Sequence, residues 1–382
     1  MSIRLVPFLC AALLPCAAQF FDPSQVSPLH LQLAPGQWEQ LQKDYLLDTY
    51  YEASLQWHNV SLPRIAIRSR GNGSRNAAKP GLKLDFDKFT SGQTVGGLKS
   101  IVLDNLVQDA SMMAEALSFQ LFQKMSIPAP RLAYVQLFVN GHPAGLYTAV
   151  EPVDKLFLKR TLNQDSGYLY DYEWTGDFRF EDRGADPALY SPLPFAPKTN
   201  EKSPDPQPIA DMVRVINAPG DLSPALAPFL NINKFIDYLA TETYLAESDG
   251  IAGEWGLNNF YFYRLEGSKE SIFIPWDKDV TFSAVDRSIW TNIETNVLTR
   301  RLLDIPEHRD YFFRALDRCA SIAGGPGGWL DLEIERIATL TRPFSTADSV
   351  KPYSNGEVDD ATEKLRRFAA GRVAFVREDI AR

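Results

Sequence analysis

A group of carboxylate and amide side chains in the second half of the chain has the composition of a site for chemistry on phosphate. Asp277 and Asp279 are two positions apart, so on an extended segment both carboxylates would point the same way and could bind one metal ion. Phosphoryl transfer needs one carboxylate to orient the attacking hydroxyl, and an amide with a further carboxylate to hold Mg²⁺ on the phosphates. The residues of these types, in this order, are Asp249, Asn258, Asn259, Asp277 and Asp279.

A helix cap or a polar strand end would explain each of these residues singly. That explanation is weaker for the whole set, because its members flank two short aromatic and apolar segments, 259–263 and 272–274, which we predict to be strands. We therefore predict that the set forms a catalytic and metal-binding site.

A basic, glycine-containing loop in the first third of the chain could bind phosphate. It contains Arg70, Gly71 and Asn72, and it lies inside the segment 64–89, whose alternating pattern predicts a hairpin or meander. Glycine lets backbone N–H groups approach a phosphate closely, and arginine adds charge-assisted hydrogen bonds. A solvated hairpin turn is the more common explanation of such a loop taken alone.

Two lysines and a glutamate are further candidates for phosphate binding. Lys79 and Lys83 follow the loop, and Lys83 lies on the polar face of an alternating segment. Glu151 ends an apolar run, where its carboxylate could pair with a lysine and hold it toward phosphates. The competing explanations are solvated lysines and a surface carboxylate before a proline, and they account for each residue taken alone.

The bulk composition limits the class of partner. The chain has 382 residues and a formal net charge of −9, so it would repel a nucleic-acid backbone, and we expect no nucleic-acid partner. With 45% hydrophobic residues it has the composition of an ordinary globular protein. Its four histidines are scattered, so any chemistry is expected to rest on carboxylates, amides and lysines.

The first residues have the form of a secretory signal peptide. Arg4 precedes the apolar run Leu5–Ala18, and a small-residue cleavage site follows near Ala18. We predict a signal peptide over residues 1–18 and a secreted or cell-envelope location, periplasmic or extracellular. The run is too short to span a bilayer and no other stretch is apolar enough, so we do not expect a membrane-spanning protein.

Strand patterns dominate the first third of the chain and helix patterns the second half, which predicts an α+β fold. The apolar segments 134–139 and 145–150 flank Asn140–Gly141, a strong hairpin signal. Asp109 can cap a helix that runs to about Met125. The expected regions are a strand-rich one over residues 19–160, a connecting or insertion loop over 161–210, and a mainly helical one with the metal segment over 211–382.

Several of these segments resemble the CotH kinase family, the relatives of spore coat protein H. They are 67–72, Lys79–Leu84, the helix block of Asp109–Met113, Leu117–Phe122 and Pro128–Pro130, and then Val139–Glu151, Asp249–Gly250, Asn258–Tyr263 and Phe273–Asp279. The resemblance covers roughly residues 60–320, and its last two segments are distinctive. It implies a two-lobed, atypical protein-kinase-like fold with a strand-rich N-terminal lobe and a helical C-terminal lobe. It also implies a secreted kinase that transfers phosphate from ATP, with Mg²⁺, to Ser or Thr of a protein partner.

The resemblance also implies a role for each candidate residue. Asp249 would be the catalytic acid/base. Asn258 or Asn259 would bind the metal with Asp277, and Asp279 would be a nearby candidate. Lys79 or Lys83 would contact the nucleotide phosphates together with the loop of Arg70, Gly71 and Asn72, and Glu151 would orient the lysine. The chain departs from the family at Ala114, where an arginine is usual, so its activity could be reduced.

Two other classes of function remain open from the sequence. The chain could be a catalytically silent surface or assembly protein that keeps the nucleotide fold. It could also be a glycoside hydrolase, which would need two carboxylates about 5–10 Å apart across one cleft and no phosphate site. Mg²⁺-dependent ATP turnover separates the kinase from the silent protein.

Overall fold

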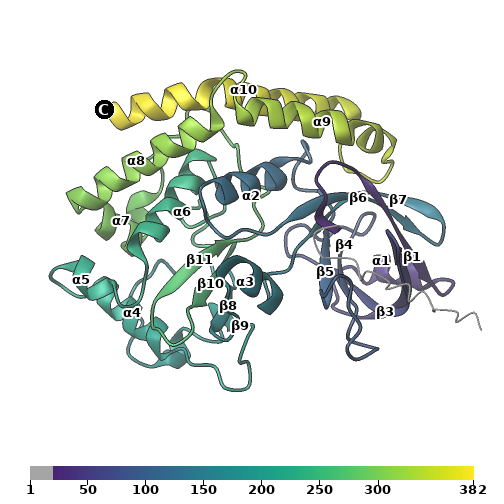
Figure 1. Cartoon of the computed structure of the whole chain (residues 1–382), viewed down its shortest axis with the longest axis horizontal. Helices are drawn as coiled ribbons and strands as arrows, with labels where there is room; N and C mark the ends of the chain where they lie inside the picture. The colour runs from purple at the N-terminus through teal and green to yellow at the C-terminus, as the bar shows by residue number, and fades with distance from the viewer. Residues whose placement is uncertain (1–19) are drawn as a thin grey trace, which may run out of the picture.

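The computed structural model describes residues 20–382, so the predicted signal peptide, residues 1–18, lies outside the described residues. The chain mixes helices and sheets as predicted: its first part is a barrel of strands, on the right of Figure 1, and its second part is mostly helical. Within the described part of the chain, none of the helices combines the length and the apolar character needed to cross a bilayer.

Seven strands close the barrel in the order β1-β2-β3-β4-β5-β7-β6. β1 alternates buried and exposed residues along its whole length and places Leu29, Leu31 and Leu33 inside. β1 pairs in parallel with β6, which closes the barrel and leaves no free sheet edge. The strands are β1 (Ser27–Leu33), β2 (Tyr51–Trp57), β3 (Val60–Arg70), β4 (Gly81–Asp85), β5 (Ser100–Asp104), β6 (Leu132–Val139) and β7 (His142–Val150).

Both hairpins expected from the sequence are confirmed. β6 and β7 are antiparallel, and they turn at Asn140 and Gly141, whose φ angles are 52° and 81°. β3 and β4 are antiparallel, with Arg70 opposite Gly81. This register places the basic, glycine-containing loop at the end of β3, on the rim of the barrel.

Four further strands form a second sheet in the order β11-β10-β8-β9, and here one prediction was wrong. The region 161–210, expected to be a connecting loop, supplies two of these strands. Phe195 explains why, because its ring packs at centroid distances of 6.5 and 5.5 Å on Phe260 and Phe262, and aromatic burial stabilises a proline-rich segment. The strands are β8 (Tyr168–Tyr172), β9 (Phe195–Pro197), β10 (Phe260–Arg264) and β11 (Ser271–Pro275).

The helices agree with the predicted helical second half. The helix expected after Asp109 begins at Ala114, and the Asp109 carboxylate caps it by accepting hydrogen bonds from the backbone N–H groups of Met113 and Ala114, both at 2.8 Å. The helices are α1 (Gln37–Lys43), α2 (Ala114–Lys124), α3 (Lys155–Leu162), α4 (Gln207–Asn217), α5 (Leu222–Leu226), α6 (Ile232–Tyr244), α7 (Val297–Leu303), α8 (Pro306–Ala323), α9 (Trp329–Ala347) and α10 (Asn355–Ala381), with 3-10 turns η2 (Pro187–Leu189) and η3 (Ile293–Thr295).

The last helix, α10, holds the end of α6 in place. Figure 1 shows α9 and α10 running along the top of the molecule, from the other helices toward the barrel. Arg372 of α10 is fully buried and donates hydrogen bonds to the backbone carbonyls of Thr243 and Tyr244, at 2.7 and 2.9 Å. It also donates to the carbonyls of Val285 and Arg287, at 2.9 and 2.6 Å. One buried cation thus fixes the end of α6, five residues before Asp249.

Candidate functional site

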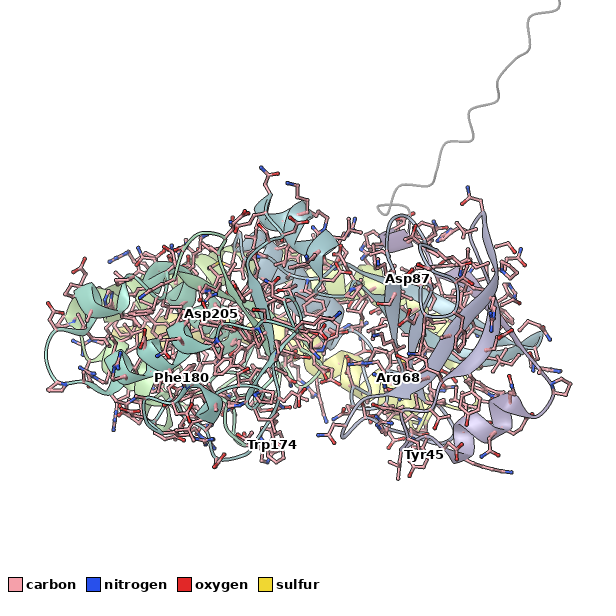
Figure 2. All side chains as sticks on the ribbon, turned by 90° about the horizontal axis from the view of Figure 1, so that it is seen from below. Tyr45, Arg68, Asp87, Trp174, Phe180 and Asp205 are labelled. Atoms are coloured by element: carbon pink, nitrogen blue, oxygen red, sulfur yellow. The ribbon has the colours of Figure 1, made fainter. Side chains whose placement is uncertain are left out.

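A cleft between the barrel and the second sheet gathers residues from both parts of the chain. It consists of two adjoining cavities of about 820 and 880 Å³, within the roughly 300–1,000 Å³ typical of ligand pockets. Arg68, Arg70, Asp171 and Trp276 line both cavities and so connect them. Figure 2 shows Arg68 on the barrel and Trp174, which lines the 820 Å³ cavity, on the other part of the molecule.

The two cavities differ in charge. Among the charged residues that line the 820 Å³ cavity, six are acidic and three are basic, and we call it the carboxylate cavity. Among those that line the 880 Å³ cavity, four are acidic and seven are basic, and we call it the lysine cavity. The first therefore favours a bound cation and the second a bound anion.

All five residues of the predicted catalytic and metal set line the carboxylate cavity: Asp249, Asn258, Asn259, Asp277 and Asp279. The second sheet explains how residues so far apart in sequence meet. β10 and β11 are antiparallel with Phe260 opposite Pro275, so the residues before β10 and after β11 lie at the same sheet edge. The Trp276 backbone N–H donates to the Asn259 carbonyl at 3.2 Å and fixes this edge.

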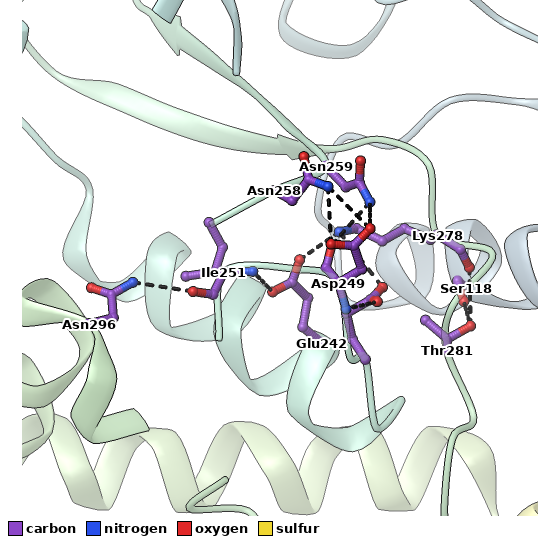
Figure 3. Close-up of polar contacts among 10 residues, drawn as sticks. Ser118, Glu242, Asp249, Ile251, Asn258, Asn259, Lys278, Thr281 and Asn296 are labelled. Carbon is purple, nitrogen blue, oxygen red and sulfur yellow. Dashed lines mark hydrogen bonds and ion pairs between the residues drawn. The ribbon is translucent and has the colours of Figure 1, made fainter. Parts of the chain in front are cut away.

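Asp249 is held by both predicted amides (Figure 3). The Asn258 side-chain N–H₂ donates to its two carboxylate oxygens at 3.0 and 3.1 Å. The Asn259 N–H₂ donates to Oδ2 at 2.9 Å and to the Asp249 backbone carbonyl at 3.0 Å. Burial raises the pKa of Asp249 above its ordinary value, while the hydrogen bonds from Asn258 and Asn259 oppose the rise. The amides thus orient a carboxylate that is partly withdrawn from water.

Asp277 and Asp279 line the same cavity, as their spacing predicted, although Asp277 has a φ of 51° and is not in regular extended backbone. The Lys278 side chain between them is fully buried and does not line the cavity. Burial, followed by repulsion from Asp104, raises the pKa of Asp277 to about 6. Burial and repulsion from Asp277 raise the pKa of Asp279 well above its ordinary value. A bound cation would relieve the repulsion between these carboxylates.

Two carboxylates near this set were missed by the sequence reasoning. Asp104 ends β5, and Glu115 lies in the first turn of α2. Burial raises the pKa of Glu115 well above its ordinary value, and repulsion from Asp104 and Asp277 adds to the shift. Asp104 could have been found from its place at the end of an apolar strand. Glu115 could not, because an acid in the first turn of a helix is common for reasons of the helix dipole alone.

The loop after β3 forms the barrel side of the carboxylate cavity, which Arg70, Gly71 and Asn72 line. Gly71 has a φ of 110°, and a Cβ atom there would lie 2.5 Å from Ser74 Oγ, so this turn requires glycine. The Arg70 guanidinium carbon lies 5.8 Å from the centroid of the Trp276 ring. Arg70 also lowers the pKa of Asp277, against the larger effect of burial. The predicted phosphate loop and the predicted metal segment therefore face each other.

Lys83 lies on β4 and lines the lysine cavity rather than the carboxylate cavity. Val102 of β5 and the segment 152–156, which follows β7, line the same cavity. The aromatic rings of Tyr261 and Trp276 form a further part of its wall and meet edge to face with centroids 5.5 Å apart. The lysine cavity thus combines cationic and aromatic groups.

Lys79 does not lie in the cleft, contrary to the phosphate-binding role that the sequence suggested. Its side chain is fully buried, and its Nζ forms an ion pair of 2.8 Å with Asp348, which is buried as well. Asp348 also accepts a hydrogen bond from the Leu146 N–H of β7 at 3.0 Å. Burial lowers the pKa of Lys79, and the Asp348 carboxylate opposes this effect. The pair joins the barrel to the segment between α9 and α10, so its role is structural.

Replacing Lys79 by methionine should therefore lower stability. Lys79→Met removes the ammonium group and leaves Asp348 as an uncompensated buried charge, which typically costs about 3–5 kcal/mol. Three backbone N–H groups still donate to Asp348, so we expect a loss near 3 kcal/mol in the free energy of unfolding. Urea unfolding followed by circular dichroism would measure it. A loss below about 1 kcal/mol, the level of an exposed ion pair, would contradict the structural role.

Glu151 is buried at the end of β7, but its partners are arginines and not the lysines that the sequence suggested. Arg131 Nη2 donates to Oε1 at 2.7 Å, and Arg160 Nη2 donates to Oε2 at 2.5 Å. The backbone explains the difference, because the N–H of Glu151 donates to the Arg131 carbonyl at 2.9 Å and so places the two side chains together. Glu151 therefore joins the residue before β6, the end of β7 and α3.

The carboxylates fit Mg²⁺ that arrives with a phosphate ligand. Across residues 20–382, no three His, Cys, Asp or Glu side chains lie close enough together to hold a metal ion unaided. Mg²⁺, however, usually binds only one or two protein carboxylates and completes its shell with water and substrate phosphates. Asp277 and Asp279 face the basic loop of Arg70 and can supply these one or two carboxylate ligands.

Comparisons with known proteins give the family of the chain. The family model described as CotH kinase protein matches residues 67–376. The inner spore coat protein H of Bacillus subtilis (strain 168) is 23% identical over 366 residues, which are 92% of this chain and 97% of that protein. The crystal structure of the Helicobacter pylori proinflammatory kinase CtkA covers 82% of this chain and 96% of its own, at 9% identity and a TM-score of 0.34, too low to support an argument. Because the family model matches most of the chain, the chain belongs to the CotH kinase protein family.

Proposed function

We propose that this protein is an atypical protein kinase that transfers the terminal phosphate of ATP, with Mg²⁺, to a Ser or Thr hydroxyl of a protein partner. The observation that carries the proposal is the cleft, where a basic glycine loop on the barrel faces an acid, two amides and two further acids from the other part. Membership of the CotH kinase family supports it. The barrel and the helical part would then be the two lobes of a kinase-like fold.

In this proposal Asp249 orients the acceptor hydroxyl. Asn258 and Asn259 fix its carboxylate, and burial makes it a better proton acceptor than an exposed aspartate. As the hydroxyl oxygen bonds to the terminal phosphorus and the bond from phosphorus to ADP breaks, Asp249 accepts the hydroxyl proton. This step balances in atoms and charge without a further reactant.

Asp277 and Asp279 would hold Mg²⁺, and Asn259 could add its side-chain carbonyl, since only its N–H₂ group is used on Asp249. A metal ion held there would supply positive charge against the phosphates. Arg70 stands between the two cavities, so its guanidinium could contact the phosphates from the barrel side. The backbone of Gly71 and Asn72 lies on the same side.

The nucleotide would extend from the carboxylate cavity into the lysine cavity. Lys83 and Asp277 line different cavities, so both can contact one nucleotide only if it crosses the shared wall at Arg70 and Trp276. Tyr261 and Trp276 offer aromatic faces for a base, and such stacking is worth about 1–3 kcal/mol. Lys79 and Glu151 take no part in this arrangement.

We also propose that the protein works outside the cytoplasm, as a secreted or envelope protein. The form of residues 1–18 supports this, and so does the similarity to a protein named as a spore coat component. The alternative function is a silent assembly protein that keeps the fold. Ala114, at a position where the family usually has an arginine, favours that alternative.

Nucleotide turnover by the purified chain beginning at Gln19 separates the two functions. The kinase predicts ATP binding by calorimetry that requires Mg²⁺, and transfer of ³²P to a generic Ser/Thr acceptor protein or to the chain itself. EDTA should abolish both signals, and Mg²⁺ should restore them. Tight binding without transfer would favour the silent protein, and the absence of both would overturn the proposed function.

A further inference from the structure

Three buried ionisable side chains, Glu242, Glu247 and Lys278, lie near the Asp249 backbone and outside the set described so far. Figure 3 shows Glu242 and Lys278 beside Asp249. Lys278 Nζ forms an ion pair of 2.7 Å with Glu242 Oε1 and lies 3.8 Å from Glu247 Oε2. The exposed fractions of Glu242, Lys278 and Glu247 are 3%, 0% and 5%. We call these three residues the charge cluster. It is built from the end of α6 and from the segment between Asp277 and Asp279.

Each glutamate of the charge cluster also holds the backbone beside Asp249. Glu247 Oε1 accepts a hydrogen bond from the Asp249 N–H at 2.8 Å. Glu242 Oε2 accepts one from the Ile251 N–H at 2.7 Å. Between them, a Cβ atom on Gly250 would lie 2.6 Å from both Glu242 carboxylate oxygens, so only glycine allows this approach. The two carboxylates therefore determine the path of the backbone on both sides of Asp249.

The lysine of the cluster comes from the other segment of the site. Lys278 stands between the two carboxylates that line the cavity, and its carbonyl accepts a hydrogen bond from Thr281 Oγ1 at 3.1 Å. The backbones of the two segments also meet, since the Ser248 N–H donates to the Val280 carbonyl at 3.2 Å. One side chain thus links the Asp249 loop with the Asp277–Asp279 segment.

A contribution to the stability of the fold does not explain the charge cluster. Burying an ammonium, its paired carboxylate and a second carboxyl group costs more than packing apolar side chains of the same volume, and replacing such groups by hydrophobic ones is often neutral or stabilising. Unlike apolar packing, the cluster makes directional hydrogen bonds to the backbone N–H groups of Asp249 and Ile251. It also links the Asp249 loop with the Asp277–Asp279 segment through one ion pair. A shift of about 1 Å between reacting groups can lower a rate about 100-fold.

We propose that Glu242, Lys278 and Glu247 are positioning residues that set the Asp249 carboxylate at a fixed place relative to Asp277 and Asp279. The expected effect on kcat rests on the proposed function. The expected effect on the backbone around Asp249 does not. Glu247 carries the sharpest test, because its hydrogen bond goes to the backbone of Asp249 itself. Glu247→Gln keeps an oxygen that can accept this bond, whereas Glu247→Leu keeps the size and loses the acceptor.

Kinetics give the first readout. Glu247→Leu should lower kcat for phosphotransfer about 100-fold, with the nucleotide KM changed less than about threefold, because binding groups remain and only alignment is lost. Glu247→Gln should retain at least about a third of the parent kcat. Lys79→Met is the matched control for a buried charge, since it breaks an ion pair of the same kind away from the cleft. Measured well below its melting temperature, its kcat should stay within about twofold of the parent.

Hydrogen exchange gives a second readout that needs no activity. Exchange measured by mass spectrometry on peptides covering residues 245–255 should show lost protection in Glu247→Leu and retained protection in Glu247→Gln. If the parent transfers no phosphate but this exchange pattern appears, the proposed function fails and the positioning device stands. If Glu247→Leu keeps its protection, or if Glu247→Gln loses kcat as Glu247→Leu does, the positioning role is overturned.

Discussion

Asp249→Asn should lower kcat for phosphotransfer roughly a thousandfold, within the 10²–10⁴ that a positioned general base contributes, and leave Mg²⁺-ATP affinity nearly unchanged. The amide cannot accept the hydroxyl proton. It also brings an N–H₂ group toward the N–H₂ groups of Asn258 and Asn259, which now donate to the carboxylate. The metal-binding carboxylates come from a different segment, so binding should survive. Single-turnover transfer assays and calorimetry on the same preparation would measure the two quantities.

A matched control removes a charge from the same cavity without touching the proposed chemistry. Glu173 is exposed and lines the carboxylate cavity, so Glu173→Gln should keep kcat within about threefold of the parent. A thousandfold loss in both variants would mean that the overall negative charge of the cavity, and not a proton acceptor at Asp249, governs the rate. An unchanged rate in Asp249→Asn would remove Asp249 from the mechanism.

Local patterns in the sequence were sufficient to predict the helices and strands that position the candidate site residues. Asn140–Gly141 predicted the β6–β7 hairpin, because both residues adopt the positive φ angles that the turn needs. Asp109 predicted a helix start through its cap. The aromatic runs predicted β10 and β11, and their antiparallel pairing brings Asn259 and Trp276 to one edge. The meeting of Asn258 and Asn259 with Asp277 and Asp279 depends on this one hairpin, which is why it could be anticipated.

Contacts between distant segments could not be read from the sequence. Lys79 follows a polar loop in the sequence. Only its ion pair with Asp348, 269 positions away, shows that its side chain is buried. Glu151 was paired in expectation with a lysine, but the β6–β7 register places Arg131 beside it. Lys278 stands between two aspartates in the sequence, and only the positions of Glu242 and Glu247 show that it is buried in an ion pair.

Asp277→Asn should abolish Mg²⁺-dependent nucleotide binding while leaving the fold intact. The amide keeps the shape of the side chain but removes one charge from the metal shell, and the remaining Asp279 carboxylate cannot hold the metal alone. Changes to groups that merely support a metal ligand cost about 10–100-fold in affinity, so loss of a ligand should cost at least about 100-fold. Calorimetry with ATP in the presence of Mg²⁺ and of EDTA would measure the loss, with circular dichroism to confirm folding.

The pH dependence of the same binding tests the assignment independently. Burial and repulsion from Asp104 raise the pKa of Asp277 to about 6, so in the free protein its carboxyl is mostly ionised at pH 7.5 and mostly protonated at pH 5. A metal ion must displace that proton, and the apparent affinity for Mg²⁺-ATP should therefore fall as the pH decreases through 6. ATP itself takes up a proton in the same range, so free Mg²⁺-ATP must be held constant by calculation at each pH. Glu173→Gln should show the same fall as the parent, whereas any binding left in Asp277→Asn should show a shallower one. If Asp277→Asn binds Mg²⁺-ATP as tightly as the parent across this range, Asp277 is not a metal ligand and the metal assignment fails.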